Sequence, residues 1–295
     1  MNMYRISLSC YFVALLATPV MASAATGNLY ESDNNTGVIN QFTSAGAKST
    51  YASGLNAPSG LGFDSAGNLY ESDTNTNAIY RFTPAGVKST FASTLNGPYG
   101  LALDAAGNIY EADNGTGKIL KFNSAGLQTT FVAAGLSNIV GLAFDSLGNL
   151  YVSDIFTGNI NRVTSAGVNT TFASGLNRPF GLVFDSADNL YEADNSGNIF
   201  KFTPAGVKST FASGLSRPYG LAFNSAGHLF EADYGSGSIF EFTPAGVKTT
   251  FATGLNGPTF LAFGVSAVPE PSTLLTLLLG CGCLMAMFTT KRRGL

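Results

Sequence analysis

Carboxylates recur at one fixed place in this sequence. Eleven of its 18 acidic residues occupy the Glu and final Asp positions in six copies of a short phrase, written "GNLYESD" at Gly67–Asp73, which start at residues 27, 67, 107, 148, 188 and 227. In an extended strand, the glutamate and the aspartate two positions later share a face. These pairs are Glu31 and Asp33, Glu71 and Asp73, Glu111 and Asp113, Glu192 and Asp194, and Glu231 and Asp233, with Val152 and Asp154 in the fourth copy.

Two kinds of chemistry suit such carboxylates. A ring of them at one end of a closed structure could hold Ca²⁺, which takes several hard oxygen ligands. Alternatively, each aspartate accepts backbone N–H groups of its own turn, because small polar residues and Gly follow it, while each glutamate reaches solvent near a rim. We favour the structural role and keep the calcium site as the alternative.

Catalysis by side chains needs a nucleophile, a base and an orienting group at one place, and these are three different residues. This sequence instead repeats one environment six times. The single histidine, His228, occupies a slot that holds Asn or its equivalent in the other copies and indicates a turn residue. No catalytic residue is therefore assigned, and the sequence favours a protein that is not an enzyme.

The copies start 39 to 41 residues apart, a spacing that is typical of propeller blades and solenoid repeats. Each unit, as in Gly100–Leu136, has four short alternating or apolar runs separated by D-x-x-G, D-N-x-x-G and S-A-G turns. Asp64–Gly67 suits a type I turn followed by a left-handed Gly, so its Asp is a turn residue and its strands are antiparallel. The sequence predicts an all-β, six-bladed β-propeller of four-stranded antiparallel blades.

The first copy of the phrase lacks the lead-in that precedes the others. The last lead-in, Gly254–Gly264, has no second half behind it. We therefore expect Phe260–Phe263 to form the inner strand of the first blade beside Gly27–Asp33. Pairing of the N- and C-terminal strands would then close the ring and hide both edges.

Ligand binding is expected where the copies differ. The residues aligned just before each inner strand are Ser59, Tyr99, Val140, Phe180, Tyr219 and Thr259. Arg178 and Arg217 stand two positions before Phe180 and Tyr219, and aromatic faces beside guanidinium groups suit sugars and carboxylates. The channel-mouth site for an acidic glycan thus comprises Tyr99, Arg178, Phe180, Arg217 and Tyr219. The alternative is that the rings fill the channel as packing.

Charge and cysteine content narrow the class further. The chain has 295 residues, with 15 basic and 18 acidic side chains. Residues 25–264 keep 11 and 17 of these, about −6, which argues against a nucleic-acid ligand because phosphate binding needs a basic surface. Cys10, Cys281 and Cys283 all lie outside that range, so no disulfide supports the domain.

Both ends of the chain have the composition of targeting segments. Arg5, the apolar run Ile6–Leu16 and Ala22–Ala24 predict a signal peptide over 1–24. Residues 265–295 contain Pro269, Glu270 and Pro271, an apolar run 274–288 that predicts a hydrophobic helix, and the basic residues Lys291, Arg292 and Arg293. The basic cluster is expected to stay cytoplasmic. The propeller domain then spans 25–264.

The stretch "GPYGLALDAAGNIYEADNGTGKILKF", Gly97–Phe122, resembles the NHL-type propeller repeat, which is related to the gluconolactonase-like family. The resemblance covers nearly all of 25–264. It implies a divalent metal held by acidic and Asn side chains around the axis, although those ligands do not map residue by residue onto this sequence. A metal-dependent lactonase or lyase is therefore the alternative function.

The C-terminal segment resembles the PEP-CTERM sorting signal. This resemblance implies recognition by an exosortase, transient inner-membrane anchoring through 274–288, cleavage near Pro269–Pro271, and release to the cell surface or exopolysaccharide matrix of a Gram-negative bacterium. A permanent anchor is the alternative. The leading hypothesis is an exported binding or scaffold module whose partner is a matrix glycan or a surface protein.

Overall fold

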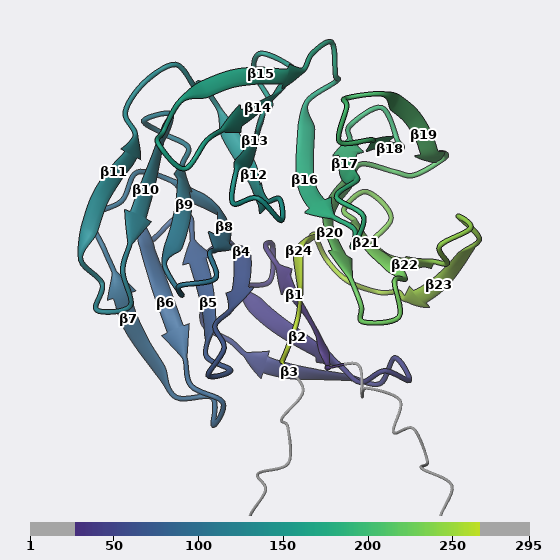
Figure 1. Cartoon of the computed structure of the whole chain (residues 1–295). Helices are drawn as coiled ribbons and strands as arrows, with labels where there is room; N and C mark the ends of the chain where they lie inside the picture. Colours follow the sequence, from purple (N-terminus) through teal and green to yellow (C-terminus); the bar gives the residue numbers. More distant parts are fainter. Residues whose placement is uncertain (1–26, 266–295) are drawn as a thin grey trace, which may run out of the picture.

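The computed structural model describes residues 27–265, which form 24 strands in six four-stranded sheets around a central axis (Figure 1). The six-bladed all-β propeller expected from the repeat is confirmed. No helix occurs within 27–265, and so none there could cross a membrane. The predicted signal peptide, sorting motif and C-terminal hydrophobic helix fall outside the described residues.

Each blade has one strand at each of four distances from the axis. The inner strands are β4 (Pro58–Phe63), β8 (Pro98–Leu103), β12 (Ile139–Phe144), β16 (Pro179–Phe184), β20 (Pro218–Phe223) and β24 (Pro258–Phe263). The second strands are β1 (Leu29–Asp33), β5 (Leu69–Asp73), β9 (Ile109–Asp113), β13 (Leu150–Asp154), β17 (Leu190–Asp194) and β21 (Leu229–Asp233). The third strands are β2 (Val38–Phe42), β6 (Ala78–Phe82), β10 (Lys118–Phe122), β14 (Asn159–Val163), β18 (Asn198–Phe202) and β22 (Ser238–Phe242). The outer strands are β3 (Lys48–Ala52), β7 (Lys88–Ala92), β11 (Gln128–Val132), β15 (Asn169–Ala173), β19 (Lys208–Ala212) and β23 (Lys248–Ala252).

The first blade is built from both ends of the chain. Its strand order is β24-β1-β2-β3, whereas the other blades use four consecutive strands. Strand β24 pairs antiparallel with β1, with Leu29 opposite Phe263, and the Gly264 N–H donates to the carbonyl of Asn28 at 2.9 Å. The closure expected from the missing lead-in is therefore confirmed.

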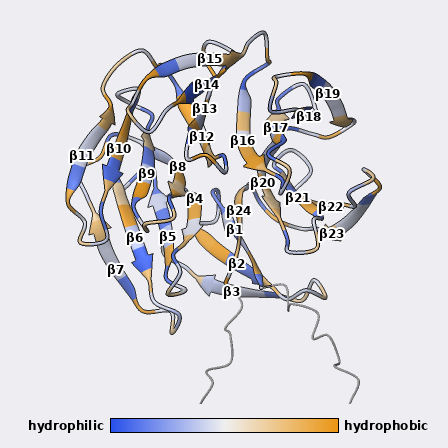
Figure 2. Cartoon of the chain, viewed as in Figure 1, coloured by the Kyte–Doolittle hydropathy of each residue, from blue (hydrophilic) through white to orange (hydrophobic). Residues whose placement is uncertain are grey.

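Apolar packing between neighbouring blades forms the core. The ring of Tyr110 meets Phe131 of its own blade at 5.0 Å and Phe144 of the next blade at 4.9 Å, both edge-on. The same arrangement recurs around Tyr151 and Tyr191, and each such pair contributes about 0.5–1.5 kcal/mol beyond burial of its area. Figure 2 shows hydrophobic residues in every blade and hydrophilic ones on outer strands such as β11 and β19.

Glycine at the third position of the inner strands lets neighbouring blades approach closely. A Cβ on Gly100 would lie 2.0 Å from the carbonyl oxygen of Val140, and one on Gly141 would lie 2.2 Å from that of Phe180. Blade 1 departs from this rule because Phe260 holds the equivalent position in β24. Its half-buried ring lies beside the axis.

The propeller has two faces, because its strands alternate in direction. The turn face carries the turns that begin at Asp64, Asp104, Asp145, Asp185 and Asn224, together with both described chain ends. The loop face carries the loops that follow the second strands and the links between blades. At the turn face, Asp64 Oδ1 accepts the N–H groups of Ala66 and Asn68 at 3.0 and 2.8 Å, and Gly67 has a φ of 79°. The role of Asp64 as a turn residue is confirmed.

Candidate functional site

The aspartates of the repeated phrase hold the loop face together. Asp73 Oδ1 accepts the N–H of Thr76 at 3.1 Å, within its own loop. Its Oδ2 accepts the N–H of Asn56, in the link from the preceding blade, at 2.7 Å. The bond to the link recurs at 2.6–2.9 Å for Asp33, Asp113, Asp154, Asp194 and Asp233. The expected turn role is confirmed, and each aspartate also fixes the neighbouring link.

The glutamates of the phrase do not reach solvent, and that expectation is wrong. Glu71 is fully buried, because it shares a strand face with Leu69, which packs against the neighbouring blade. No side chain within 27–265 donates a hydrogen bond to either carboxylate oxygen of Glu71. Glu111, Glu192 and Glu231 share this state, whereas Glu31 accepts one bond, from Asn40 Nδ2 at 2.8 Å.

Burial sets the protonation of these glutamates. Burial, with a smaller contribution from the charge of Asp33, raises the pKa of Glu31 to about 8, although the hydrogen bond from Asn40 and the charge of Lys48 oppose the rise. The same two causes hold the pKa of Glu71 well above its usual range, with Lys88 opposing them. Glu111, Glu192 and Glu231 are shifted in the same direction. A neutral carboxyl is a poor metal ligand, because metals bind the deprotonated form.

No group of three or more His, Cys, Asp or Glu side chains within 27–265 lies close enough to hold a metal ion. The carboxylates of the phrase therefore do not assemble into a shared ligand set. The axis offers no alternative one. Its channel, of about 410 Å³, is lined by residues of all six inner strands such as Leu101, Ala143, Val183 and Phe260, none of them acidic or Asn. The metal implied by the gluconolactonase resemblance does not fit these residues.

Aromatic side chains seal the loop-face end of the channel. The rings of Phe180 and Tyr219 stack at 4.0 Å with 21° between their planes, and they are only 2% and 8% exposed. The Tyr219 hydroxyl lies 3.2 Å from that of Tyr99. These residues lie inside the inner strands, as the second residue of each, and not before them. Of the two alternatives for the rings, the structure shows packing.

The two arginines of the predicted mouth remain accessible. Arg178 and Arg217 are exposed and have left-handed φ angles of 54° and 63°. The Arg217 guanidinium lies 4.6 Å from the ring centre of Tyr234. Burial raises the pKa of Tyr99, and the charges of Arg217 and Arg178 oppose that rise, so both guanidinium groups act on the same buried hydroxyl. The structure thus places two cations over the sealed channel end.

Hydroxyl groups complete the other half of this channel end. Ser32 Oγ donates to the Ser59 carbonyl at 2.7 Å and lies 3.0 Å from Thr259 Oγ1. The loop after β13 in blade 4 also contributes to the sealed channel end, because its Ile155 packs against the Phe180–Tyr219 cluster. Its neighbour Phe156 stays 79% exposed. The sequence comparison of blades did not indicate that Ile155 belongs to this cluster.

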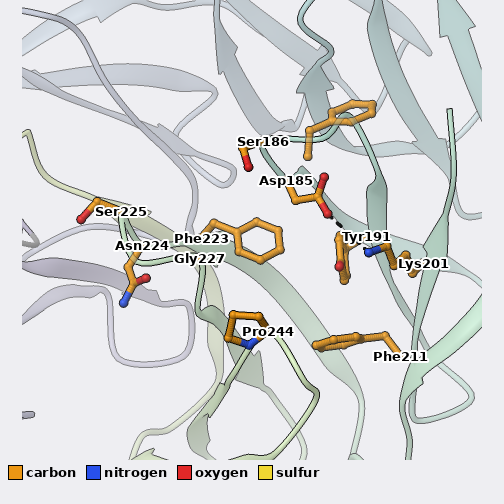
Figure 3. Close-up of a pocket in the computed structure, with 11 residues that line it drawn as sticks. Asp185, Ser186, Tyr191, Lys201, Phe211, Phe223, Asn224, Ser225, Gly227 and Pro244 are labelled. Atoms are coloured by element: carbon orange, nitrogen blue, oxygen red, sulfur yellow. Dashed lines mark ion pairs between the residues drawn. The ribbon is translucent and has the colours of Figure 1, made fainter.

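A pocket that the sequence did not predict lies at the turn face between blades 5 and 6 (Figure 3). It encloses about 470 Å³ between Phe211 and Phe223, with the ion pair of Asp185 and Lys201 at 3.5 Å on its wall. Asp185 begins a turn equivalent to that of Asp64, and this position predicts only a turn residue. In the sequence, the pocket is marked only by Asn224 and Gly227 in the turn of the next blade. These two residues indicate a pocket only once the fold shows that their turn faces the turn of Asp185.

His228, near the same turn, has a structural role. Its backbone N–H donates to Asn224 Oδ1 at 2.9 Å, as the residue at this position does in the other turns. Its ring Nδ1 lies 2.6 Å from Glu241 Oε1. The interpretation of His228 as a turn residue is confirmed.

Comparison with known proteins supports the fold and finds a family match over part of the chain. A family model described as the SMP-30/Gluconolactonase/LRE-like region matches residues 22–156. A chain in a nidogen/laminin complex has a similar structure. The alignment covers 79% of this protein and 97% of that chain, with 22% identity and a TM-score of 0.73. A streptogramin B lyase aligns over 82% of this chain and 88% of its own, with 16% identity and a TM-score of 0.66. A gluconolactonase from Xanthomonas campestris aligns over 70% and 83%, with 16% identity and a TM-score of 0.64.

No curated protein matches the sequence. The solved structures above are too distant in sequence to transfer more than the fold. They include a chain from a nidogen/laminin complex, a lyase and a gluconolactonase, so the architecture hosts both binding and catalysis.

Proposed function

We propose that this chain is an exported propeller that binds an acidic glycan of the cell surface or exopolysaccharide matrix. The observation that carries the proposal is the pair of exposed guanidinium groups, Arg178 and Arg217, from neighbouring blades over a sealed channel end. Two such groups can pair with the carboxylate of a uronic acid through charge-assisted hydrogen bonds. The exposed Phe156 lies on the same face and adds an apolar contact.

The same geometry argues against the lactonase or lyase alternative. Such chemistry would need metal ligands or an acid–base pair in one blade or junction that the other blades do not repeat. The axial channel supplies aliphatic and aromatic walls, and the buried glutamates face the spaces between blades. A binding or scaffold role requires only a surface that differs from one blade to the next, and Arg178 and Arg217 provide such a surface at two neighbouring blades.

Export and sorting complete the proposal. Residues 1–24 act as a signal peptide, and 265–295 act as an exosortase-recognised segment that anchors the chain transiently through 274–288. Pro269–Pro271, Arg292 and Arg293 are the sequence features that support this role. Co-expression with an exosortase should yield a shortened chain whose C-terminus lies near residue 270 by mass spectrometry. A permanent anchor would leave the chain at full length, and Glu270→Ala would then change nothing.

Glycan binding is tested with the full-length chain in mild detergent on an array of neutral and uronic-acid polysaccharides, with and without calcium. We expect uronate binding that weakens with salt and does not require calcium. The double variant Arg178→Ala/Arg217→Ala should lose at least about tenfold in affinity. The matched control, Arg81→Ala/Arg162→Ala, removes the same charge from the turn face and should bind normally. Equal losses in both variants would point to a general charge effect and against the mouth.

A further inference from the structure

The groove between neighbouring blades at the turn face differs in size from one junction to the next. It encloses about 470 Å³ between blades 5 and 6, but about 100 Å³ between blades 4 and 5 and about 50 Å³ between blades 6 and 1. The repeats that build these junctions are close copies. A few substitutions must therefore open the one at blades 5 and 6.

A bridge between turns closes the smaller groove between blades 4 and 5. Asp188 stands where the other complete turns have Gly, and it reaches across to the turn of blade 4. Its Oδ1 accepts the Ser146 N–H at 3.0 Å, and its Oδ2 accepts the Ser146 hydroxyl. Arg162 also lines that groove. The bridge and the long side chain together occupy the space.

The junction of blades 5 and 6 lacks this bridge. The equivalent residues are Ser186 and Gly227, and both line the pocket. Gly227 has no side chain to reach Ser186. The nearest atom to a Cβ placed there would be Pro244 Cγ at 3.9 Å, so the space above Gly227 is open. Gly227 therefore leaves open the space that Asp188 and its bridge occupy in the groove between blades 4 and 5.

The walls of the pocket combine aromatic faces with one cation and one anion, as Figure 3 shows. Phe211 and Phe223 each lie 5.1 Å from the ring of Tyr191 and flank the cavity. Asp185 is held in place by the N–H groups of Ala187 and Asn189 at 3.0 and 2.9 Å. Lys201 lies 3.5 Å from Asp185. The polar wall is therefore fixed in position and carries no net charge.

We propose that this pocket binds one pyranose ring of a neutral glycan. The aromatic side chains provide apolar contact for the C–H face of the ring, Asp185 accepts hydrogen bonds from sugar hydroxyls, and Lys201 donates to ring or hydroxyl oxygens. The cavity has the size of a small-ligand site. A uronic acid is disfavoured because its carboxylate would meet Asp185. This inference rests on the proposed function as a glycan binder and adds a second site on the opposite face.

The test substitutes the residue that blade 5 already uses. Gly227→Asp places a carboxylate opposite Ser186, and the φ of 78° at Gly227 is close to the left-handed 56° that Asp188 adopts. Gly148→Asp is the matched control, because Ala105 in the turn of blade 3 has no hydroxyl to bridge. Lys201→Gln is a second variant that keeps the pocket open but removes the cation. All three are compared with the wild type by melting temperature.

Saturation-transfer NMR on the full-length chain, with methyl glycosides of neutral hexoses and N-acetylhexosamines as probes, measures binding. We expect saturable binding by the wild type and by Gly148→Asp. Gly227→Asp should bind at least about tenfold more weakly, and Lys201→Gln should lose at least about threefold.

The outcomes separate this pocket from the arginine mouth. Undiminished sugar binding by Gly227→Asp would place the neutral sugar elsewhere and overturn the pocket. If no neutral sugar binds while uronate binding through Arg178 and Arg217 persists, the pocket fails and the proposed function stands. If no glycan of either kind binds, both fail.

Discussion

Five glutamates in this propeller are fully buried. No side chain in the described part of the chain donates a hydrogen bond to either oxygen of Glu71, yet the fold places it beside a fully buried Leu69. In blade 4, Val152 occupies the position equivalent to Glu71, and it is fully buried in an apolar cluster with Val163. The environment at this position therefore suits an apolar side chain. A buried carboxyl without a partner is destabilising when ionised, so the native state keeps it protonated.

These glutamates predict that the protein loses stability as pH rises. The folded state binds a proton on Glu31 up to a pKa of about 8, whereas the unfolded chain releases it near 4.5. Stability from this proton is therefore complete below pH 4.5 and is lost progressively up to about pH 8. We expect the melting temperature to fall by at least about 3 °C between pH 5 and pH 8.

Two variants isolate the glutamates from other titrating groups. Glu71→Gln should melt like the wild type at pH 5 and higher than the wild type at pH 8. Val152→Glu adds a sixth buried glutamate and should steepen the decline. Identical pH profiles for all three proteins, measured by calorimetry, would show that the glutamates ionise without cost to the fold.

The inner strands depend on the close approach that Gly permits. Gly100→Ala would press a Cβ to 2.0 Å from the backbone oxygen of Val140, so two blades must separate. Overpacking of this kind costs about 1–3 kcal/mol, which predicts a fall of roughly 2–12 °C in melting temperature. Gly214→Ala is the control, because its Cβ would have open space and only the left-handed φ of 74° disfavours it. A smaller loss for Gly100→Ala than for Gly214→Ala would contradict this account.

Much of the fold follows from local spacing, and the sites do not. The repeat predicts the blades, the aspartate caps and the pairing of β24 with β1, because each depends on residues at fixed offsets. The burial of Glu71 was missed although period-2 alternation sets it on the face of Leu69; its charge favoured a solvent-exposed interpretation. The stacking of Phe180 on Tyr219 depends on how the inner strands of two neighbouring blades pack. The pocket depends on how Ser186 meets Gly227, about 40 residues away.

At the scale of the whole molecule, stability depends on the last strand. Truncation before Pro258 would leave β1 without its inner partner and expose the apolar edge of blade 1. We expect that variant to be insoluble or to lose its cooperative melting transition. Truncation after Val265 keeps the Gly264 bond to Asn28 and should leave the melting temperature within about 1 °C of the full chain. A soluble and cooperatively melting chain that ends at Gly257 would contradict the importance of closure.

The order of strands in blade 1 also bears on how the chain matures. A chain that emerges from its N-terminus exposes β1 early, but the partner of β1 arrives about 230 residues later. Five blades can assemble from consecutive strands, whereas the first blade lacks its inner strand until β24 is available. The final step is then a long-range loop closure, which makes it the slowest contact to search for and the one most open to competition from other chains.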